Sequence, residues 1–293
     1  MLFFIQIFSL LPLKALYFIA DYLIYPLMYG AIKYRRNIVR KNLSLSFPEK
    51  NEQELKQLEK AFYHHFSDTI VEIIHGYRIS DEQMRSRVQY VNTHDIEQAA
   101  LERGGAFVML GHIGNWEWLA DVGRRYDSPD VIEYNVYRKQ KNESIDKAML
   151  AIRAKRGGEC IEKNSLVRHI ISLNKQKQKF ILGLIADQKP TPVNAHFWTT
   201  FLHQDTSFLI GGETLAKKFN YPIYYAYTRK LQRGYYQVEF VLLSHNPSEN
   251  THYEATQAYA SALEKNIIEQ PELWLWTHNR WKYPRPQQTQ QTT

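Results

Sequence analysis

The sequence lacks the signals of several common functional classes. The chain of 293 residues has one cysteine, Cys160, which excludes an internal disulfide framework and a cysteine-rich metal site. We interpret Cys160 as a small packed residue rather than a nucleophile. The chain has no phosphate-binding Gly-Lys-Ser/Thr loop, no dinucleotide-binding glycine pattern after a strand and no His-Glu-x-x-His zinc helix. We therefore expect no metal, nucleotide or nicotinamide cofactor.

An uninterrupted apolar run of membrane-spanning length is also missing. A spanning helix has about 20 predominantly apolar residues. Residues 1–32 form the only long apolar stretch, and it is interrupted by Gln6, Pro12, Lys14, Asp21 and Pro26. Lys14 and Asp21 share roughly one helical face, which favours helical segments that lie in the membrane interface. An uncleaved spanning anchor and a buried helix of a soluble protein are the alternatives. A removed signal peptide is not expected, because no basic region precedes the stretch and no clear cleavage signature follows it.

The charge of the chain is basic, with a net value of +7. No helix-turn-helix, zinc-finger or RNA-binding aromatic motif accompanies it, so we expect anionic lipid or an acidic protein as partner and no nucleic acid. Five cations without an intervening acid follow the apolar segment: Lys33, Arg35, Arg36, Arg40 and Lys41. Such a cluster marks the cytoplasmic side of a membrane and attracts anionic headgroups by about 1 kcal/mol per residue.

The hydrophobic pattern predicts an α/β fold with a mixed, mostly parallel sheet flanked by helices. A capping box at Asn51–Glu54 begins a long amphipathic helix that runs to about Gly76, and Ser80 with Gln83 begins a shorter one. From Gly104 strands and helices alternate. The predicted strands are Ala106–Leu110, Val131–Tyr137, Phe180–Ala186, Tyr221–Thr228 and Tyr236–Leu243, the last two forming an antiparallel hairpin. The predicted helices are Asn115–Arg125, Glu143–Arg156, Ser165–Lys175, Gly211–Phe219 and one that begins at Thr251–Glu254.

This pattern divides the chain into three parts. Residues 1–32 are the membrane-associating segment, 33–286 the main domain, and 287–293 a tail of Gln and Thr that we expect to be disordered.

A histidine and a carboxylate follow the first of the five predicted strands, in Gly111-His112-Ile113-Gly114-Asn115-Trp116-Glu117. Residues five apart within one helix lie about 140° from each other. The two side chains can therefore meet only if His112 lies on the turn before the helix and Glu117 reaches back to it. In that arrangement Glu117 holds one ring nitrogen and the other accepts a proton, which suits general-base activation of a hydroxyl. Backbone N–H groups near Gly114 and Asn115 are candidate oxyanion donors.

The chain resembles the late acyltransferases of lipid A biosynthesis, the lauroyl/myristoyl transferase family, which is related to the glycerolipid acyltransferases. The resemblance rests on the His112/Glu117 spacing, on the run Arg36–Leu43 followed by Ser46-Phe47-Pro48, and on the block Pro271–Lys282. It implies a glycerolipid-acyltransferase-like fold on the cytoplasmic face of the inner membrane. The implied reaction moves a fatty acyl group from an acyl-carrier-protein thioester to a hydroxyl of a lipid A precursor, without a covalent acyl-enzyme. Another acceptor, such as an amino-acid or phosphoglycosyl lipid, a coenzyme A donor, and a non-catalytic lipid- or carrier-binding membrane protein remain alternatives.

Three further residues become candidates for substrate binding. Asp187 ends a predicted buried strand, and open α/β sheets place ligands at strand carboxyl ends. The resemblance adds a functional aspartate in the motif that Ala186-Asp187-Gln188 matches. It also implies an important arginine between the His112 block and the Asp187 strand, for which Arg153 is favoured and Arg156 competes. Arg138 is a weaker candidate, and arginine suits phosphate because its planar fork binds oxygen pairs.

The C-terminal block is rich in aromatic and basic residues. Trp274, Trp276, His278, Arg280, Trp281 and Lys282 predict either packing under the sheet or anchoring at a membrane interface, and we favour packing. His278 is expected to be structural rather than a second base.

Overall fold

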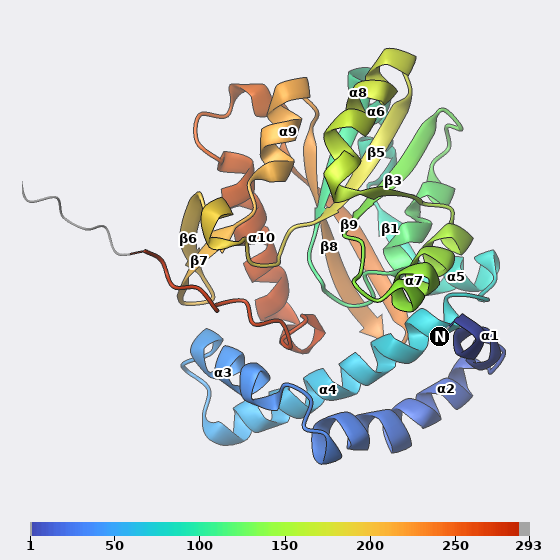
Figure 1. The fold of residues 1–293 in the computed structure, drawn as a ribbon, viewed down its shortest axis with the longest axis vertical. Helices are drawn as coiled ribbons and strands as arrows, with labels where there is room; N and C mark the ends of the chain where they lie inside the picture. Colours follow the sequence, from blue (N-terminus) through green and yellow to red (C-terminus); the bar gives the residue numbers. More distant parts are fainter. Residues whose placement is uncertain (1, 287–293) are drawn as a thin grey trace, which may run out of the picture.

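A seven-stranded mixed sheet forms the centre of the molecule (Figure 1). The structure, a computed structural model, describes residues 2–286, so the tail predicted at 287–293 lies outside the described residues. The strands are β1 (Val88–Val91), β2 (Gly105–Leu110), β3 (Val131–Tyr137), β4 (Glu159–Glu162), β5 (Lys179–Ile185), β8 (Ile223–Gln232) and β9 (Tyr235–Ser244). Their order is β1-β9-β8-β2-β5-β3-β4, and every neighbouring pair is parallel except β8 and β9. The predicted α/β class and mixed, mostly parallel sheet are confirmed.

Alternating strand residues supply two cores, one on each face of the sheet. Phe107 and Met109 of β2 belong to one core, whereas Val108 and Leu110 belong to the other, as the two-residue period of a strand requires. The helices α8 (Leu166–Gln176), α9 (Gly211–Phe219) and α10 (Glu254–Glu269) cover the first face. The other face is covered by α5 (Asp81–Arg87), α6 (Thr93–Arg103) and the 3-10 helix η3 (Trp118–Arg125).

Some elements differ from the sequence prediction. The short edge strands β1 and β4 were not predicted, nor was a separate antiparallel hairpin of β6 (Phe197–Phe201) and β7 (Gln204–Phe208). The helix predicted at Asn115–Arg125 is a 3-10 helix that begins only at Trp118. The Gly123 N–H donates to Glu133 Oε2 at 2.6 Å instead of closing an α-helical turn. The remaining short elements are α7 (Glu143–Arg156), η4 (Lys163–Ser165), η5 (Pro192–Asn194), η6 (Pro247–Glu249) and η7 (Pro271–Leu273).

A long helix, α4 (Glu52–His75), crosses the edge of the sheet at which β8 ends, beside α3 (Arg36–Ser46) (Figure 1). The capping boxes predicted before α4 and α5 are both present, with Asn51 and Ser80 as N-caps. A capping box satisfies otherwise free N–H groups of the first helical turn, which explains why these two helix starts could be located from the sequence.

Residues 2–31 fold into short helices that lie along α4, below the sheet in Figure 1. They are α1 (Leu2–Phe8), α2 (Leu13–Ile19) and two π-helical stretches, η1 (Ala20–Ile24) and η2 (Pro26–Ala31). Within residues 2–286 no single helix has the length and hydropathy to cross a bilayer, although 2–8 and 13–31, bent by 117° at their junction, meet both criteria as a pair. One side of these helices packs on the domain through Ile5 and Leu16. The other side exposes large apolar side chains: Phe3, Phe4, Leu10, Phe18, Tyr22, Leu23 and Ile32.

Candidate active site

The pairing of β2 with β5 brings His112 and Asp187 together. Leu110 is the register partner of Ile185. His112 and Asp187 each follow one of these partners by two positions, so they leave the sheet side by side. His112 Nδ1 lies 2.6 Å from Asp187 Oδ1, and the His112 backbone N–H donates to Asp187 Oδ2 at 2.8 Å. The carboxylate that holds the His112 ring is therefore Asp187, and the contact predicted for Glu117 is wrong.

The negative charge of Asp187 favours the protonated form of the His112 ring. Burial opposes the charged imidazolium, but the adjacent carboxylate outweighs burial and raises the pKa of His112 above its ordinary value. Burial likewise disfavours the Asp187 carboxylate. Two effects outweigh this burial and lower the pKa of Asp187 to about 2. They are the charge of His112 and the hydrogen bonds that the His112 ring, the His112 backbone and the Trp274 indole donate. With Nδ1 directed at Asp187, Nε2 is the nitrogen left to accept a proton, and it faces the Gln188 amide at 3.4 Å.

Backbone hydrogen bonds from the C-terminal block hold the loop that carries His112. Ile113 forms an isolated antiparallel bridge with Trp274, the Gly114 N–H donates to the Leu273 carbonyl, and the Leu275 N–H donates to the His112 carbonyl. The Trp274 indole N–H donates to Asp187 Oδ2 at 2.8 Å. Gly114 has a φ of +62°, which disfavours other residues there.

Two consequences follow for the sequence prediction. Trp274 and Trp276 are buried, which confirms packing rather than interfacial exposure for both. The role of Trp274 beside Asp187 was missed, because the aromatic pattern gave no indication of its partner. The N–H of Gly114, predicted as an oxyanion donor, is already bonded to Leu273.

Glu117 pairs with Arg153 instead of His112. Arg153 on α7 donates through Nε and Nη2 to the two Glu117 carboxylate oxygens, at 2.8 and 2.7 Å. Both groups are mostly buried, with 5% of the Glu117 side chain and 18% of the Arg153 side chain exposed. Burial opposes the Arg153 charge, but Glu117 outweighs it and raises the pKa of the guanidinium. The bidentate pair holds both groups charged and fixed.

The other arginine candidates lie apart from this pair. Arg156 is buried one helical turn farther along α7, where Nη2 donates to the Ile79 carbonyl and Nη1 approaches Asp121 at 4.0 Å. Arg138 follows β3 and is exposed. Of the two arginines weighed from the sequence, Arg153 is the one that contacts Glu117.

A pocket lies beside the Glu117–Arg153 pair. Its walls include Trp116, Glu117, Arg153 and Ile185. It shares Leu110, Asn135 and Gly183 with a second, mainly apolar cavity between η3 and the sheet. The two cavities are therefore neighbours, and the second is lined mostly by apolar side chains.

Glu72 of α4 links the loop after His112 to the N-terminal helices. Its carboxylate accepts hydrogen bonds from Tyr17 Oη at 2.7 Å, Asn115 Nδ2 at 3.0 Å and Tyr236 Oη at 2.8 Å. Its backbone carbonyl accepts the Trp118 indole N–H at 3.0 Å. Glu72 is fully buried, so these donors replace the water that an exposed carboxylate would bind.

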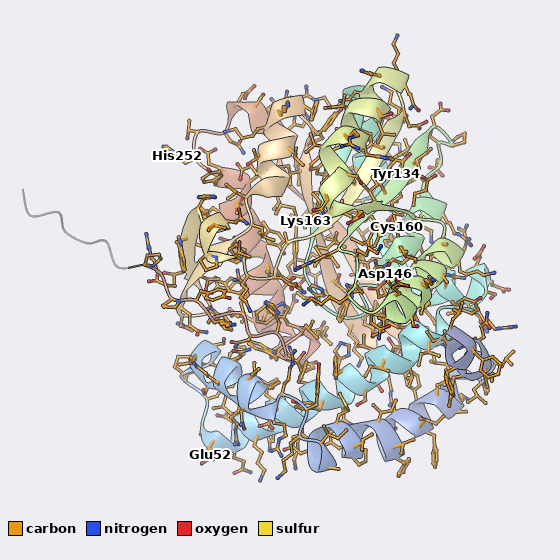
Figure 2. The ribbon with its side chains drawn as sticks, in the orientation of Figure 1. Glu52, Tyr134, Asp146, Cys160, Lys163 and His252 are labelled. Atoms are coloured by element: carbon orange, nitrogen blue, oxygen red, sulfur yellow. The ribbon has the colours of Figure 1, made fainter. Side chains whose placement is uncertain are left out.

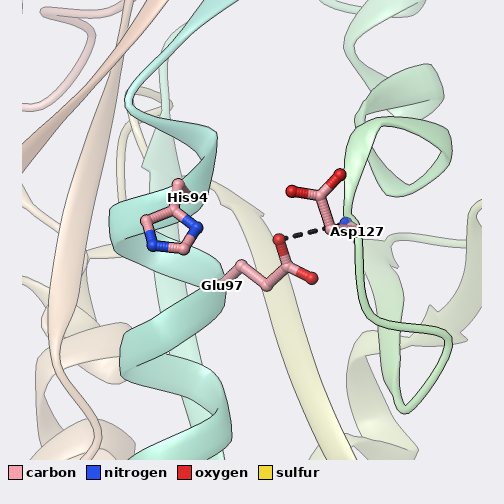
Figure 3. A group of neighbouring side chains, drawn as sticks. All are labelled: His94, Glu97 and Asp127. Atoms are coloured by element: carbon pink, nitrogen blue, oxygen red, sulfur yellow. Dashed lines mark hydrogen bonds between the residues drawn. The ribbon is translucent and has the colours of Figure 1, made fainter.

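Two other groups carry side chains of types that can act in chemistry. Cys160 lies on β4, next to α7 (Figure 2), and burial raises the pKa of its thiol although the charge of Arg153 opposes the shift. A raised pKa disfavours the nucleophilic thiolate. His94, Glu97 and Asp127 place possible metal ligands within 4.8 Å of one another (Figure 3). Both Glu97 oxygens, however, already accept backbone N–H groups of Asp127 and Ser128, which identifies Glu97 as a loop cap.

Comparison with known proteins identifies the chain. The sequence profile described as bacterial lipid A biosynthesis acyltransferase matches residues 1–283. The chain belongs to the bacterial lipid A biosynthesis acyltransferase family. This lipid A acyltransferase is therefore an enzyme that transfers an acyl group, and the family implies a lipid acceptor. Among curated proteins none matches the sequence.

Proposed function

We propose that this lipid A acyltransferase transfers a fatty acyl group from an acyl-carrier-protein thioester to a hydroxyl of a lipid A precursor, with His112 as general base. The proposal rests on the family for its substrates and on one observation for its chemistry. That observation is the His112–Asp187 pair, whose imidazole ring lies 5.0 Å from the ring of Trp116, a residue that lines the pocket beside Glu117 and Arg153.

In the proposed reaction His112 Nε2 removes the proton of the acceptor hydroxyl. The oxygen attacks the thioester carbonyl carbon, a C–O bond forms and the C–S bond breaks. The imidazolium then returns the proton to the departing thiolate. Asp187 fixes the tautomer with Nε2 unprotonated and stabilises the imidazolium. This sequence needs no covalent acyl-enzyme and no cofactor.

The Glu117–Arg153 pair has a different proposed role. Because its charges are matched, it forms a fixed polar wall of the pocket. The apolar side chains behind Leu110 form the surface proposed to contact the acyl chain. The bidentate bond with Glu117 uses Nε and Nη2 of Arg153. In this proposal Arg153 contacts substrate mainly through its third nitrogen, Nη1. Arg138, exposed beyond β3, remains a candidate contact for a substrate phosphate.

A comparison of two donors tests the proposed function. The net charge of +7 favours an acidic carrier protein, and opposite charges make encounter salt-dependent. We expect the purified enzyme to use the carrier thioester with a higher kcat/KM than the coenzyme A thioester of the same acyl chain. We also expect the transfer rate at sub-saturating donor to decline more steeply with ionic strength for the carrier thioester than for the coenzyme A thioester. Equal kcat/KM and equal salt slopes would exclude carrier docking, and no transfer from either donor would exclude the proposed reaction.

We further propose that the N-terminal helices hold the enzyme on the cytoplasmic face of the inner membrane. Their outer side exposes Phe18, Tyr22 and Leu23 by 64%, 71% and 61%. The basic cluster that follows is smaller than its sequence indicates. Arg36 and Arg40 pair with the buried Glu59, at 2.7 and 3.3 Å, and Arg35 donates to the Thr277 carbonyl, which leaves Lys33 and Lys41 for anionic headgroups.

Replacing the three exposed residues by serine (F18S/Y22S/L23S) should weaken vesicle binding about tenfold or more, because each fully buried large apolar side chain contributes about 1.5–3 kcal/mol. Sedimentation with anionic vesicles at high salt isolates this apolar part, since salt screens the cations. V193S/I268S changes exposed apolar residues elsewhere and should have no effect. Wild-type enzyme that remained soluble at low salt without detergent would contradict membrane attachment.

A further inference from the structure

A cluster of cations lies beside His112 and is not used by the chemistry described above. Its members come from three distant segments: Arg35 before α3, Lys189 after β5, and Lys282 in the C-terminal block. Arg35 Nη1 donates to the Thr277 carbonyl at 3.1 Å, and Lys189 Nζ donates to the Asn279 carbonyl at 3.0 Å. The C-terminal block therefore gathers the three side chains.

The cluster has no compensating negative charge in contact. Among residues 2–286, no carboxylate oxygen lies within 4.0 Å of Arg35, Lys189 or Lys282. Other cations of this protein do have such partners, as in Arg36–Glu59 and Arg233–Asp68. The ammonium groups of Lys189 and Lys282 lie 5.7 and 5.3 Å from the centre of the same Tyr283 ring.

Mutual repulsion within the cluster is visible at Lys189. Burial lowers the pKa of its ammonium group, and three neighbouring cations lower it further, namely Lys282, Arg280 and Arg35. Arg280 is 3% exposed and lies over the Phe208 ring, so it adds charge from beneath without reaching solvent. Like charges held together in this way favour an anion that can be shared among them.

The cluster adjoins the proposed base through Gln188 and His278. Gln188, next to Lys189 in the chain, reaches His112 Nε2 at 3.4 Å. The Lys189 backbone N–H donates to His278 Nε2 at 3.3 Å, and the charges of both Asp187 and His112 act on His278. On its other side the cluster meets the exposed apolar helices, because Arg35 follows Ile32 by three residues. A phosphate held by Lys189 therefore lies on the segment that directly follows Asp187, the partner of His112.

We propose that Arg35, Lys189 and Lys282 form a phosphate-binding site for the substrate that reacts at His112. The proposal rests on the acyl transfer proposed above and assigns the phosphate recognition to this cluster rather than to the paired Arg153. The phosphate belongs either to the acceptor lipid or to the phosphopantetheine arm of the donor, and the two sources can be separated by experiment.

The test measures binding and turnover with matched substrates that do or do not carry phosphate. We expect K189Q, K282Q and R35Q each to raise KM for the phosphate-bearing substrate about tenfold or more, since each removes a charge-assisted hydrogen bond to the phosphate. The value of kcat should change little, and Lys189→Arg should restore KM. Lys175→Gln, an exposed lysine on α8, serves as the control.

Two pairs of substrates identify the source of the phosphate. One pair is the acceptor before and after removal of its phosphate groups, and the other is acyl-phosphopantetheine and acyl-pantetheine. In each pair the wild type is expected to prefer the substrate with phosphate. The pair for which K189Q loses this preference identifies the substrate whose phosphate binds the cluster. Unchanged preference in both pairs for all three variants would overturn the site.

A binding measurement separates this proposal from the proposed function. Titration of each substrate into H112A reports phosphate recognition without turnover. Loss of affinity in H112A/K189Q relative to H112A supports the site even if no transfer is observed, and equal affinity for every substrate contradicts it. Absence of transfer by the wild type bears only on the proposed reaction.

Discussion

Replacing His112 by alanine should lower kcat about 10²- to 10⁴-fold, the contribution that general-base catalysis usually makes. The ring accepts the hydroxyl proton in the proposed reaction, and no other imidazole contacts Asp187 in residues 2–286. Only 13% of the His112 side chain is exposed, but its loss leaves Asp187 with two N–H donors, from the His112 backbone and Trp274. We therefore expect the melting temperature to change far less than the rate.

A second substitution separates the loss of the base from damage to the site. Asparagine at position 112 retains an amide N–H that can donate to Asp187 but has no group that accepts a proton at neutral pH. His112→Asn should be as inactive as His112→Ala. Acyl transfer and thermal melting on purified variants check both results, and near-normal turnover of either variant would remove His112 from the mechanism.

Changing Asp187 to asparagine should cost on the order of 10³- to 10⁴-fold in kcat, the scale observed when the carboxylate beside a catalytic histidine becomes an amide. The amide no longer imposes the tautomer in which Nε2 is free, and it does not stabilise the imidazolium. The shape of the side chain is nearly unchanged, so the Trp274 contact can persist through the amide oxygen.

The pH profile gives this prediction a second readout. Only neutral His112 acts as base, so activity should fall as pH decreases through its pKa, which Asp187 raises above the ordinary value of 6.5. In Asp187→Asn that carboxylate is gone while burial remains. The pKa of His112 therefore decreases, and the acid limb of the residual activity moves to lower pH.

Glu117→Gln is the matched comparison for Asp187→Asn. It removes another carboxylate whose charge acts on His112, but one that is bonded to Arg153 rather than to the imidazole. Whatever the effect of Glu117→Gln on kcat, the acid limb of its pH–activity profile should remain closer to that of the wild type than the acid limb of Asp187→Asn does. An acid limb that moved with Glu117→Gln and not with Asp187→Asn would assign the orienting carboxylate to Glu117 after all.

The five longest strands could be located from the sequence because each is a run of apolar residues bounded by turn residues. The observed β2 and β3 agree with the predicted ranges to within one residue. Shorter elements left weaker signals. Strands β1 and β4 have four residues each, and the β6–β7 turn uses Leu202 and His203 at positive φ where a glycine or asparagine would have indicated a hairpin.

The partner of His112 could not be deduced in the same way. Both Glu117 and Asp187 follow a predicted strand in plausible positions, and spacing along the chain favoured the nearer one. What decides between them is the adjacency of β2 and β5 and their register, which depend on the packing of the whole sheet. The same packing brings Trp274 to Asp187 from 87 residues away.

The hydrogen bonds of Glu72 bear on how this enzyme should be trimmed for study. Deleting residues 1–32 to gain solubility would remove the Tyr17 hydroxyl from a fully buried carboxylate that also anchors Asn115 of the His112 loop. It would also uncover Ala148 and Ile152 on α7, the helix that carries Arg153, where Ile5 now packs. A shortened enzyme that is inactive thus says nothing about membranes. Only substitutions on the outer side of these helices can separate attachment to lipid from support of the active site.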